Sequence, residues 1–268
     1  MVLRGFIDES YDRQIFVLSA VVGVGTVWRG LSKSWNACIE KRNERLRAQG
    51  RNTISRFHAA ECNSQDNEYK GWSRPEQIEF MAELIGILGR EELDSVAFAL
   101  DIGDLYKAFP DARKKSKPDL LRTLYGIMTK FMILMMAPPY VAADPTIRIT
   151  LVHDRCEYDG VIADAFRDAV EDREFKERGC YTAITPGSSL KVIPLQMADL
   201  IAHENFKEVK RRYRSPKGKI PKRRTSLKVM IAQGNFAGGV HYISLDALRS
   251  LARHVARGKG AKSKIQSD

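Results

Sequence analysis

An apolar run at the start of the chain ends abruptly in two carboxylates. The segment Phe6-Ile7-Asp8-Glu9-Ser10 closes this run, and a second apolar run over residues 15–22 follows after only a few polar residues. Two apolar runs joined by so short a connection indicate a pair of antiparallel strands with residues 11–13 at the tip. Asp8 would then lie where the first strand leaves the core, held by rigid backbone and open to solvent. The same polar residues are also what an ordinary turn requires.

The size and composition of the chain favour a folded, soluble protein. Its 268 residues are 44% hydrophobic, enough to bury the core of one large domain or of one domain with an appendage. The longest apolar stretch, residues 127–141, is interrupted by polar and proline residues before it reaches the roughly 20 apolar residues of a membrane span. Arg4 and Asp8 break the early apolar run, so no signal peptide is predicted. We expect a cytoplasmic protein without a membrane contact.

The remaining sequence alternates between helical and strand patterns. Helices are predicted over residues 26–49, 73–89, 119–136, 158–176 and 245–257, and another helix begins at residue 194 and has residues 195–203 in its first turns. Strands are predicted over residues 51–57, 95–100, 147–152, 181–184 and 190–193. Gly50 and Pro138-Pro139 are expected to end two of the helices, and a capping box of Ser73 and Glu76 is expected to begin another. Alternation after residue 95 indicates parallel crossover connections, whereas the short first connection indicates antiparallel pairing. The predicted fold class is α/β, with a mixed β-sheet flanked by α-helices.

Four carboxylates stand at positions where separate elements could bring them together. Asp8, Glu61 and Asp154 each follow a predicted strand, and Asp199 belongs to a predicted helix. Adjacent carboxylates raise one another's pKa, and divalent cations relieve that repulsion. Mg²⁺ and Mn²⁺ prefer oxygen ligands, and two such ions about 3.5–4 Å apart can support in-line phosphodiester cleavage. We therefore predict an Mg²⁺ or Mn²⁺ site made by these four residues.

Histidine and cysteine residues near these carboxylates allow other interpretations. His203 follows Asp199 by one helical turn on the same face, so it could act as a proton shuttle or product-release group, or be an ordinary core or surface histidine. His58, Cys62, His153 and Cys156 could in principle bind zinc, but their spacing fits no standard zinc finger. The four cysteines are far apart in the sequence, which favours reduced thiols.

The charge of the chain favours a polyanionic partner. Lys and Arg total 44 against 33 Asp and Glu, a formal net charge of +11, and much of the excess lies in residues 207–228. A basic run of this kind can also be a solvated loop. The residues predicted to contact nucleic acid are Lys207, Lys210, Arg211, Arg212, Arg214, Lys217, Lys219, Lys222, Arg223 and Arg224.

Four short segments carry a further indication of the fold. They are Phe6-Ile7-Asp8-Glu9-Ser10, Phe57-His58-Ala59-Ala60-Glu61, Val152-His153-Asp154-Arg155 and Leu195-Gln196-Met197-Ala198-Asp199-Leu200. Together they resemble the domain of unknown function 3800 family, and the resemblance extends to about residue 212. Members of that family are regarded as having an RNase H-like fold, and many occur in mobile-element or phage-defence settings.

The resemblance implies roles for particular residues. The family's acidic positions match Asp8, Glu61, Asp154 and Asp199, and we expect a surrounding shell of Glu9, Ser10, His58 and Gln196, with Gln196 alternatively holding the preceding loop. In RNase H-like sheets the carboxylate beside the first strand comes from the first crossover strand, so Asp101 is the alternative to Asp154. Tyr11 stands where the family commonly has glycine, which would alter the turn.

These observations predict an RNase H-like domain over residues 1–206, a basic loop or insertion over 207–243, and a helix with a disordered basic tail over 244–268. The first functional hypothesis is a metal-dependent nuclease acting on DNA or RNA. The second is a catalytically silent RNase H-like module that binds nucleic acid or a partner protein, and the third is a nucleotide phosphohydrolase on the same scaffold. A partner protein or a homo-oligomer is compatible with each hypothesis.

Overall fold

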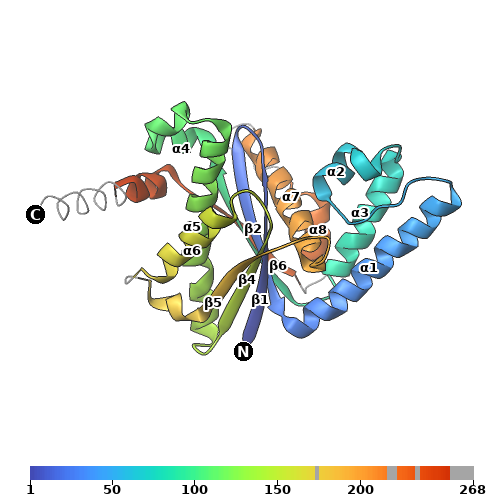
Figure 1. The fold of residues 1–268 in the computed structure, drawn as a ribbon, viewed down its shortest axis with the longest axis horizontal. Helices are drawn as coiled ribbons and strands as arrows, with labels where there is room; N and C mark the ends of the chain where they lie inside the picture. Colours follow the sequence, from blue (N-terminus) through green and yellow to red (C-terminus); the bar gives the residue numbers. More distant parts are fainter. Residues whose placement is uncertain (173–174, 216–221, 233–235, 254–268) are drawn as a thin grey trace, which may run out of the picture.

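The described part of the chain forms a single mixed β-sheet with helices on both faces (Figure 1). The computed structural model describes residues 1–172, 175–215, 222–232 and 236–253. Within them, six strands follow the order β5-β4-β1-β2-β3-β6. This confirms the predicted α/β class with a mixed sheet flanked by helices and is consistent with an RNase H-like fold.

The sheet begins with the predicted hairpin of β1 (Val2–Tyr11) and β2 (Ile15–Val24), which pair antiparallel. Asp12 Oδ1 accepts hydrogen bonds from the backbone N–H groups of Gln14 and Ile15, at 2.8 and 3.0 Å, and so closes the turn. Tyr11 stacks on Phe16 of the opposite strand. No residue of this turn has a positive φ, so the turn does not need the glycine that the family commonly has after the acidic residues.

The directions of the other strands bring two predicted site residues to one edge. β3 (Leu93–Asp101) is antiparallel to β2, β4 (Arg148–Asp154) is parallel to β1, β5 (Tyr181–Gly187) is parallel to β4, and β6 (Phe236–Tyr242) is parallel to β3. Ile7 pairs with His153, so Asp8 and Asp154 follow side by side where β4 ends and β1 continues to Tyr11 paired with β2 alone. Asp101 ends β3, which lies two strands away from β1. Its Oδ1 accepts the Gly103 N–H and so caps the helix that follows. The sheet order therefore favours Asp154 over Asp101.

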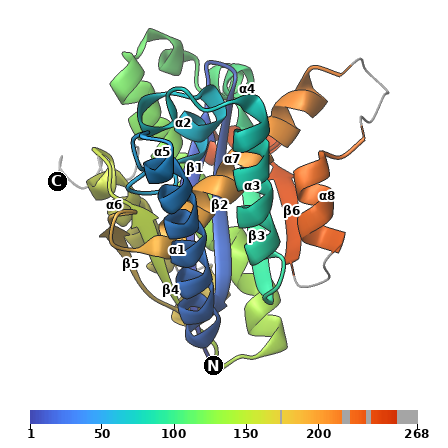
Figure 2. The same ribbon diagram turned by 90° about the vertical axis from the view of Figure 1, so that its right-hand side faces the viewer.

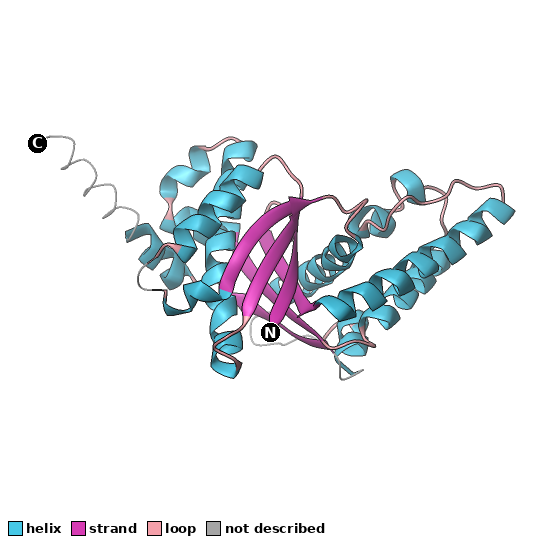
Figure 3. Ribbon diagram, turned by 60° about the horizontal axis from the view of Figure 1, so that its bottom comes forward, coloured by secondary structure: helices cyan, strands magenta, loops and turns pink. Residues whose placement is uncertain are grey.

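The two faces of the sheet carry different helices (Figures 1 and 3). On one face lie α4 (Ile102–Ala108), α5 (Lys117–Ala143) and α6 (Asp159–Val170), and on the other lie α1 (Gly25–Ala48), α2 (Ala59–Ser64), α3 (Arg74–Leu88), α7 (Ile193–Tyr213) and α8 (Thr225–Ala232). Successive side chains of β1 point to opposite faces of the sheet. Phe6 therefore packs in the core on the α1–α3–α7 side, and Ile7 packs in the core on the α5–α6 side. α7 packs directly on β1 and β2.

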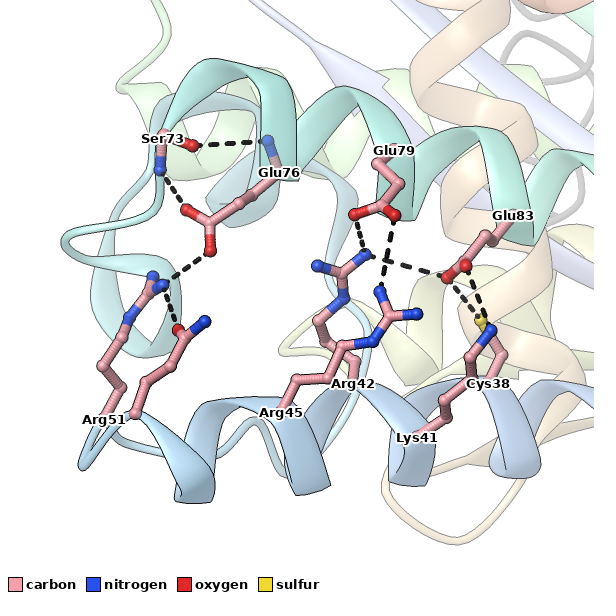
Figure 4. Close-up of polar contacts among 10 residues, drawn as sticks. Cys38, Lys41, Arg42, Arg45, Arg51, Ser73, Glu76, Glu79 and Glu83 are labelled. Atoms are coloured by element: carbon pink, nitrogen blue, oxygen red, sulfur yellow. Dashed lines mark hydrogen bonds and ion pairs between the residues drawn. The ribbon is translucent and has the colours of Figure 1, made fainter.

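Helices α1 and α3 form an arm that lies beside α7 (Figure 2). α1 ends before Gly50, whose φ of +67° is readily adopted only by glycine, and α3 begins with the predicted capping box of Ser73 and Glu76. Ion pairs join the two helices along their length, including those of Arg42 with Glu79 and Glu83 (Figure 4). The arm therefore has polar as well as apolar connections between its helices.

Two predicted strands are absent from the described structure. Residues 51–57 are irregular, with a bend at residues 55 and 56, and join no ladder. The Asn43 side chain instead pairs with both the N–H and the C=O of Ile54 at 2.9 Å. Residues 190–192 form a turn that leads directly into α7 at Ile193. In the first segment hydrogen bonds to a side chain, and in the second hydrogen bonds within a turn, replace the hydrogen bonds to a neighbouring strand.

Helix boundaries also differ from prediction on the opposite face. Pro138-Pro139 does not end α5, which continues to Ala143. The carbonyls that lose their N–H partners belong to Leu134 and Met135, and Met135 is 55% exposed, so water can replace the missing donors. α6 ends at Val170, earlier than the predicted residue 176.

Residues 207–243, predicted as a basic loop or insertion, are not a loop over most of their described part. α7 continues to Tyr213, α8 follows, and β6 adds a strand beside β3. Leu227 and Met230 of α8 are buried, so the basic residues share this segment with an apolar face. Residues 245–253 are helical as predicted, with Leu248 fully buried, whereas the predicted tail over 254–268 lies outside the described residues.

One helix in the described part, α5, is long and apolar enough by composition to cross a membrane, with a mean hydropathy of 1.4 in its most apolar window. Half of that window is buried inside the protein. Met128, Met132 and Ile133 have no exposed surface and pack in the core against the sheet. The helix is compatible with a soluble protein.

Candidate functional site

A polar cavity of about 400 Å³ lies at the edge of the sheet where β1 and β4 end. Most of the predicted site residues line it, namely Asp8, Glu9, Ser10, His58, Asp154, Asp199 and His203. The other lining residues, which the sequence did not assign to the carboxylate site, are Tyr11, Arg56, Ala60, Arg155, Cys156 and Ser189. The structure therefore brings together residues from β1, β4, α7 and the segment before α2, which are up to about 190 positions apart in the chain.

Asp8 is the carboxylate at the centre of this arrangement. Its Oδ1 accepts the Glu9 backbone N–H at 2.8 Å. Burial, followed by the negative charges of Glu9 and Asp199, raises the pKa of Asp8 well above its ordinary value. A buried carboxylate beside other carboxylates is stabilised as an anion only when a cation compensates the charge.

Asp199 faces the cavity from α7. Its Oδ2 accepts the backbone N–H of Ala59 at 2.7 Å, which fixes the start of α2 against α7. Burial raises the pKa of Asp199 to about 6, and the nearby His58 acts in the opposite direction. His58 caps α2, since its Nδ1 accepts the backbone N–H of Glu61 at 3.3 Å. The predicted one-face arrangement of Asp199 and His203 is confirmed, because both line the same cavity.

Asp154 is held differently from the other two aspartates. Its Oδ1 accepts the backbone N–H groups of Arg155 at 3.0 Å and Ser189 at 3.1 Å. Its Oδ2 lies 4.0 Å from Arg56 Nη1, and Arg56 also hydrogen-bonds the Ser189 hydroxyl. Arg56 therefore places a cation among the carboxylates. Its position directly before Phe57-His58 was the only sequence signal for it.

Gln196 joins three segments around the cavity. Its Oε1 accepts hydrogen bonds from Trp35 Nε1 at 3.0 Å and from the Phe57 backbone N–H at 2.9 Å, and its Nε2 donates to the Ser189 carbonyl at 2.8 Å. Gln196 is 1% exposed, so all these polar groups are satisfied inside the protein. It holds the segments that carry His58 and Arg56 on one side and Ser189 on the other.

His203 lies in the wall of the cavity and is 8% exposed. Its Nε2 is buried and has no hydrogen-bond partner in the described residues. Burial, together with the positive charge of Lys207, lowers the pKa of His203 to about 4. The imidazole is therefore neutral near pH 7 and is a weak base there.

Two predicted acidic residues occupy other positions. Glu61 lies on α2, half-buried, and is not among the residues that line the cavity. Glu9 lines the cavity but hydrogen-bonds Tyr125 of α5, on the opposite face of β1 from α7. Burial raises the pKa of Glu9 as well. The structure thus brings three of the four predicted metal ligands, Asp8, Asp154 and Asp199, into one cavity.

The donor set of this cavity fits Mg²⁺ or Mn²⁺, because its carboxylate oxygens are the ligands that these ions prefer. The three aspartates are nevertheless more widely spread than the ligands of a single small ion. Within the described chain, three potential ligand atoms lie within 4.8 Å of one another only at His153, Cys156 and Asp159. The spread is consistent with mutual repulsion and with the separate backbone contacts of Asp154 and Asp199.

The zinc site considered from the sequence does not form as a set of four. Cys62 of α2 is fully buried in the hydrophobic core on the α1–α3–α7 side. His153 and Cys156 instead lie close to Asp159. All four cysteines are free thiols, in agreement with the expectation of reduced thiols.

Most of the predicted nucleic-acid contacts in the described chain are engaged in internal ion pairs. Glu204 pairs with Lys207 and Arg224, Asp12 with Lys210, and Glu208 with Arg211 and Arg212. Arg214, Lys222 and Arg223 are exposed. Lys217 and Lys219 lie outside the described residues.

Comparison with protein-family models and with curated proteins finds no match for the chain. The resemblance to the domain of unknown function 3800 family therefore depends on the four segments themselves. The structure brings residues from all four of these segments close to the cavity.

Proposed function

We propose that this protein is a metal-dependent nuclease that hydrolyses phosphodiester bonds at the cavity between β1, β4 and α7. The observation that carries the proposal is the convergence of Asp8, Asp154 and Asp199 there, with the pKa of Asp8 and Asp199 raised by burial and by neighbouring negative charge. Such a group of carboxylates is suited to compensation by divalent cations. Glu61 is left out of the ligand set because it does not line the cavity.

In this proposal Asp8, Asp154 and Asp199 would hold Mg²⁺ or Mn²⁺, which supply a Lewis acid and lower the pKa of a bound water. Ser189 and Ala59 hold two of these carboxylates in place through backbone N–H groups. Arg56 offers a cation to the non-bridging oxygens of the scissile phosphate. His203, neutral near pH 7, would offer its unpartnered Nε2 for one hydrogen bond beside the carboxylates.

The substrate and the cellular location belong to the same proposal. The net charge of +11 and the exposed Arg214, Lys222 and Arg223 favour DNA or RNA as the substrate. Four free thiols suit the reducing cytoplasm. A role in phage defence or in a mobile element rests on the family resemblance alone.

The test is a cleavage panel of labelled DNA and RNA with Mg²⁺, Mn²⁺ or chelator, using the double variant Asp8→Asn, Asp199→Asn. We expect cleavage to fall at least about 100-fold, since the loss of metal-site groups has effects of this order, while nucleic-acid binding persists. Asp164→Asn on α6 is the matched control, because this exposed carboxylate lies outside the cavity. Undiminished cleavage by the double variant would contradict the site assignment.

A second candidate is the catalytically silent binding module. It is favoured by the spread of the three aspartates beyond 4.8 Å and by the position of Arg56 beside Asp154. Wild-type protein that binds nucleic acid but cleaves no member of the panel with either metal would support it.

A further inference from the structure

A second group of potential metal ligands lies at the turn from β4 into α6. His153 is the penultimate residue of β4, Cys156 lies in the turn, and Asp159 is the first residue of α6. One ligand atom from each lies within 4.8 Å of the other two. The three residues follow one another at intervals of three, so a span of seven residues, 153–159, presents a nitrogen, a sulfur and an oxygen donor.

Existing contacts hold this turn in a shape that favours ligation. Asp159 Oδ1 accepts the Cys156 backbone N–H at 2.9 Å, and the Asp159 N–H donates to the Cys156 carbonyl at 3.3 Å. His153 is 4% exposed, and its Nδ1 lies 3.7 Å from Asp159 Oδ1. Bond lengths of about 2.0–2.3 Å place tetrahedral zinc ligands roughly 3.3–3.8 Å apart, so this pair already has suitable spacing.

We propose that His153, Cys156 and Asp159 form a binding site for a thiophilic divalent cation such as Zn²⁺, chemically distinct from the carboxylate site in the cavity. A mixed nitrogen, sulfur and oxygen donor set selects zinc or cobalt over magnesium. Three protein ligands leave the fourth tetrahedral position to water. When the ion binds, the Cys156 S–H bond breaks, the sulfur forms a bond to the metal, and the thiol proton passes to solvent. The proton that His153 Nδ1 directs at the Asp154 carbonyl moves through solvent to Nε2, which frees the Nδ1 lone pair for the metal.

The two sites would occupy neighbouring positions. His153 Nδ1 lies 3.0 Å from the Asp154 carbonyl oxygen, and Cys156 lines the cavity that contains the Asp154 side chain. An ion bound at the turn would therefore fix the end of β4, which carries a proposed ligand of the carboxylate site. The zinc-type site itself does not depend on the proposed nuclease function.

The experiment is a Co²⁺ titration of chelator-treated full-length protein in excess Mg²⁺, followed by absorption spectroscopy. We expect one equivalent of Co²⁺ to produce a thiolate-to-cobalt charge-transfer band together with tetrahedral ligand-field bands. Cys156→Ser should abolish the charge-transfer band, and Asp159→Asn should weaken binding at least about tenfold. Both residues are half-buried, so these variants disturb packing less than a change at His153 would.

Two controls separate this site from other sulfur and oxygen ligands. Cys38→Ser should keep the band, because this half-buried cysteine contacts Glu83 on the α1–α3 arm. The Asp8→Asn, Asp199→Asn variant should also keep it, so failure of the nuclease proposal leaves this result unchanged. Absence of the band in wild-type protein, or its persistence in the folded Cys156→Ser variant, would overturn the inference.

Discussion

At the scale of single residues, Asp199 shows how the cavity combines rigid positioning with unfavourable charge. Its carboxylate is fixed by the Ala59 N–H, and burial raises its pKa to about 6. The folded pKa therefore lies above the ordinary value of about 3.9 for an unfolded chain. The resulting stabilisation is fully present below the unfolded pKa and is lost as pH rises through the folded pKa.

Asp199→Asn should therefore make metal-free protein less sensitive to pH. We expect the free energy of unfolding of the variant, minus that of wild type, to rise by about 1–2 kcal/mol from roughly pH 4 to pH 7.5. The reason is that asparagine retains the acceptor for the Ala59 N–H and has no charge to bury. Urea denaturation in chelator at the two pH values measures this. A wild-type-minus-variant difference that stays constant with pH would contradict it.

Site residues marked by an apolar run or by helical spacing could be predicted from the sequence. Residues whose position depends on the folded arrangement of the segments could not. Asp8 and Asp154 could be predicted because each follows an apolar run, and Asp199 and His203 because of their helical spacing. Arg56 was missed, since an arginine in an irregular segment gives no periodic signal. The exclusion of Glu61 from the cavity wall depends on the orientation of α2, which sequence spacing does not determine.

At the scale of elements, the arm formed by α1 and α3 is organised around a buried arginine. The Arg42 side chain is 5% exposed, and its Nη2 donates to Glu79 at 2.8 Å (Figure 4). Its guanidinium also lies 5.5 Å from the ring centroids of Trp72 and Phe80. The stem and the charge of this residue are therefore both enclosed between the helices.

Removal of Arg42 should have a much larger effect than removal of its exposed neighbour. Arg42→Ala should lower the free energy of unfolding by about 2–3 kcal/mol, because packing and buried polar contacts are lost together. The Arg45 side chain is 44% exposed and pairs with the same Glu79. Arg45→Ala should therefore change the free energy of unfolding by less than about 0.5 kcal/mol. Thermal or urea denaturation of the two variants makes the comparison, and equal effects would contradict the role given to burial.

Elements with strong local signals were predicted well, and those decided by tertiary partners were not. The capping box at Ser73 and Gly50 identified the ends of two helices because both act within one turn. The pattern of residues 51–57 predicted a strand, but the backbone of Ile54 hydrogen-bonds the Asn43 side chain instead of a neighbouring strand. β6 escaped prediction because its partner β3 lies more than 130 residues earlier in the chain.

At the scale of the whole molecule, the excess positive charge is partly neutralised within the fold. Glu204 and Glu208 are each 2% exposed in their side chains and pair with four cations between them. Buried carboxylates of this kind anchor α7 and the residues before α8 to each other. The cations free to meet a polyanion are therefore fewer than the composition indicates.

Salt dependence should distinguish the exposed from the paired cations. Lys222→Ala and Arg223→Ala should each reduce the slope of log K against log salt by up to about 1 for single-stranded DNA, because each removes one phosphate contact. Lys210→Ala should change the slope less, since Lys210 pairs with Asp12. Fluorescence anisotropy across a salt series measures the slopes, and a larger change for Lys210 would contradict this assignment.

The place of β6 in the sheet also has a consequence for synthesis on the ribosome. β3 gains its second neighbour only when residues 236–242 have been translated, long after residues 93–101 have left the exit tunnel. Until then the nascent chain presents the unpaired backbone of β3, and an unpaired strand edge is a template for association with other chains. Premature termination anywhere before Phe236 therefore yields a product in which β3 is an unpaired edge strand of the sheet.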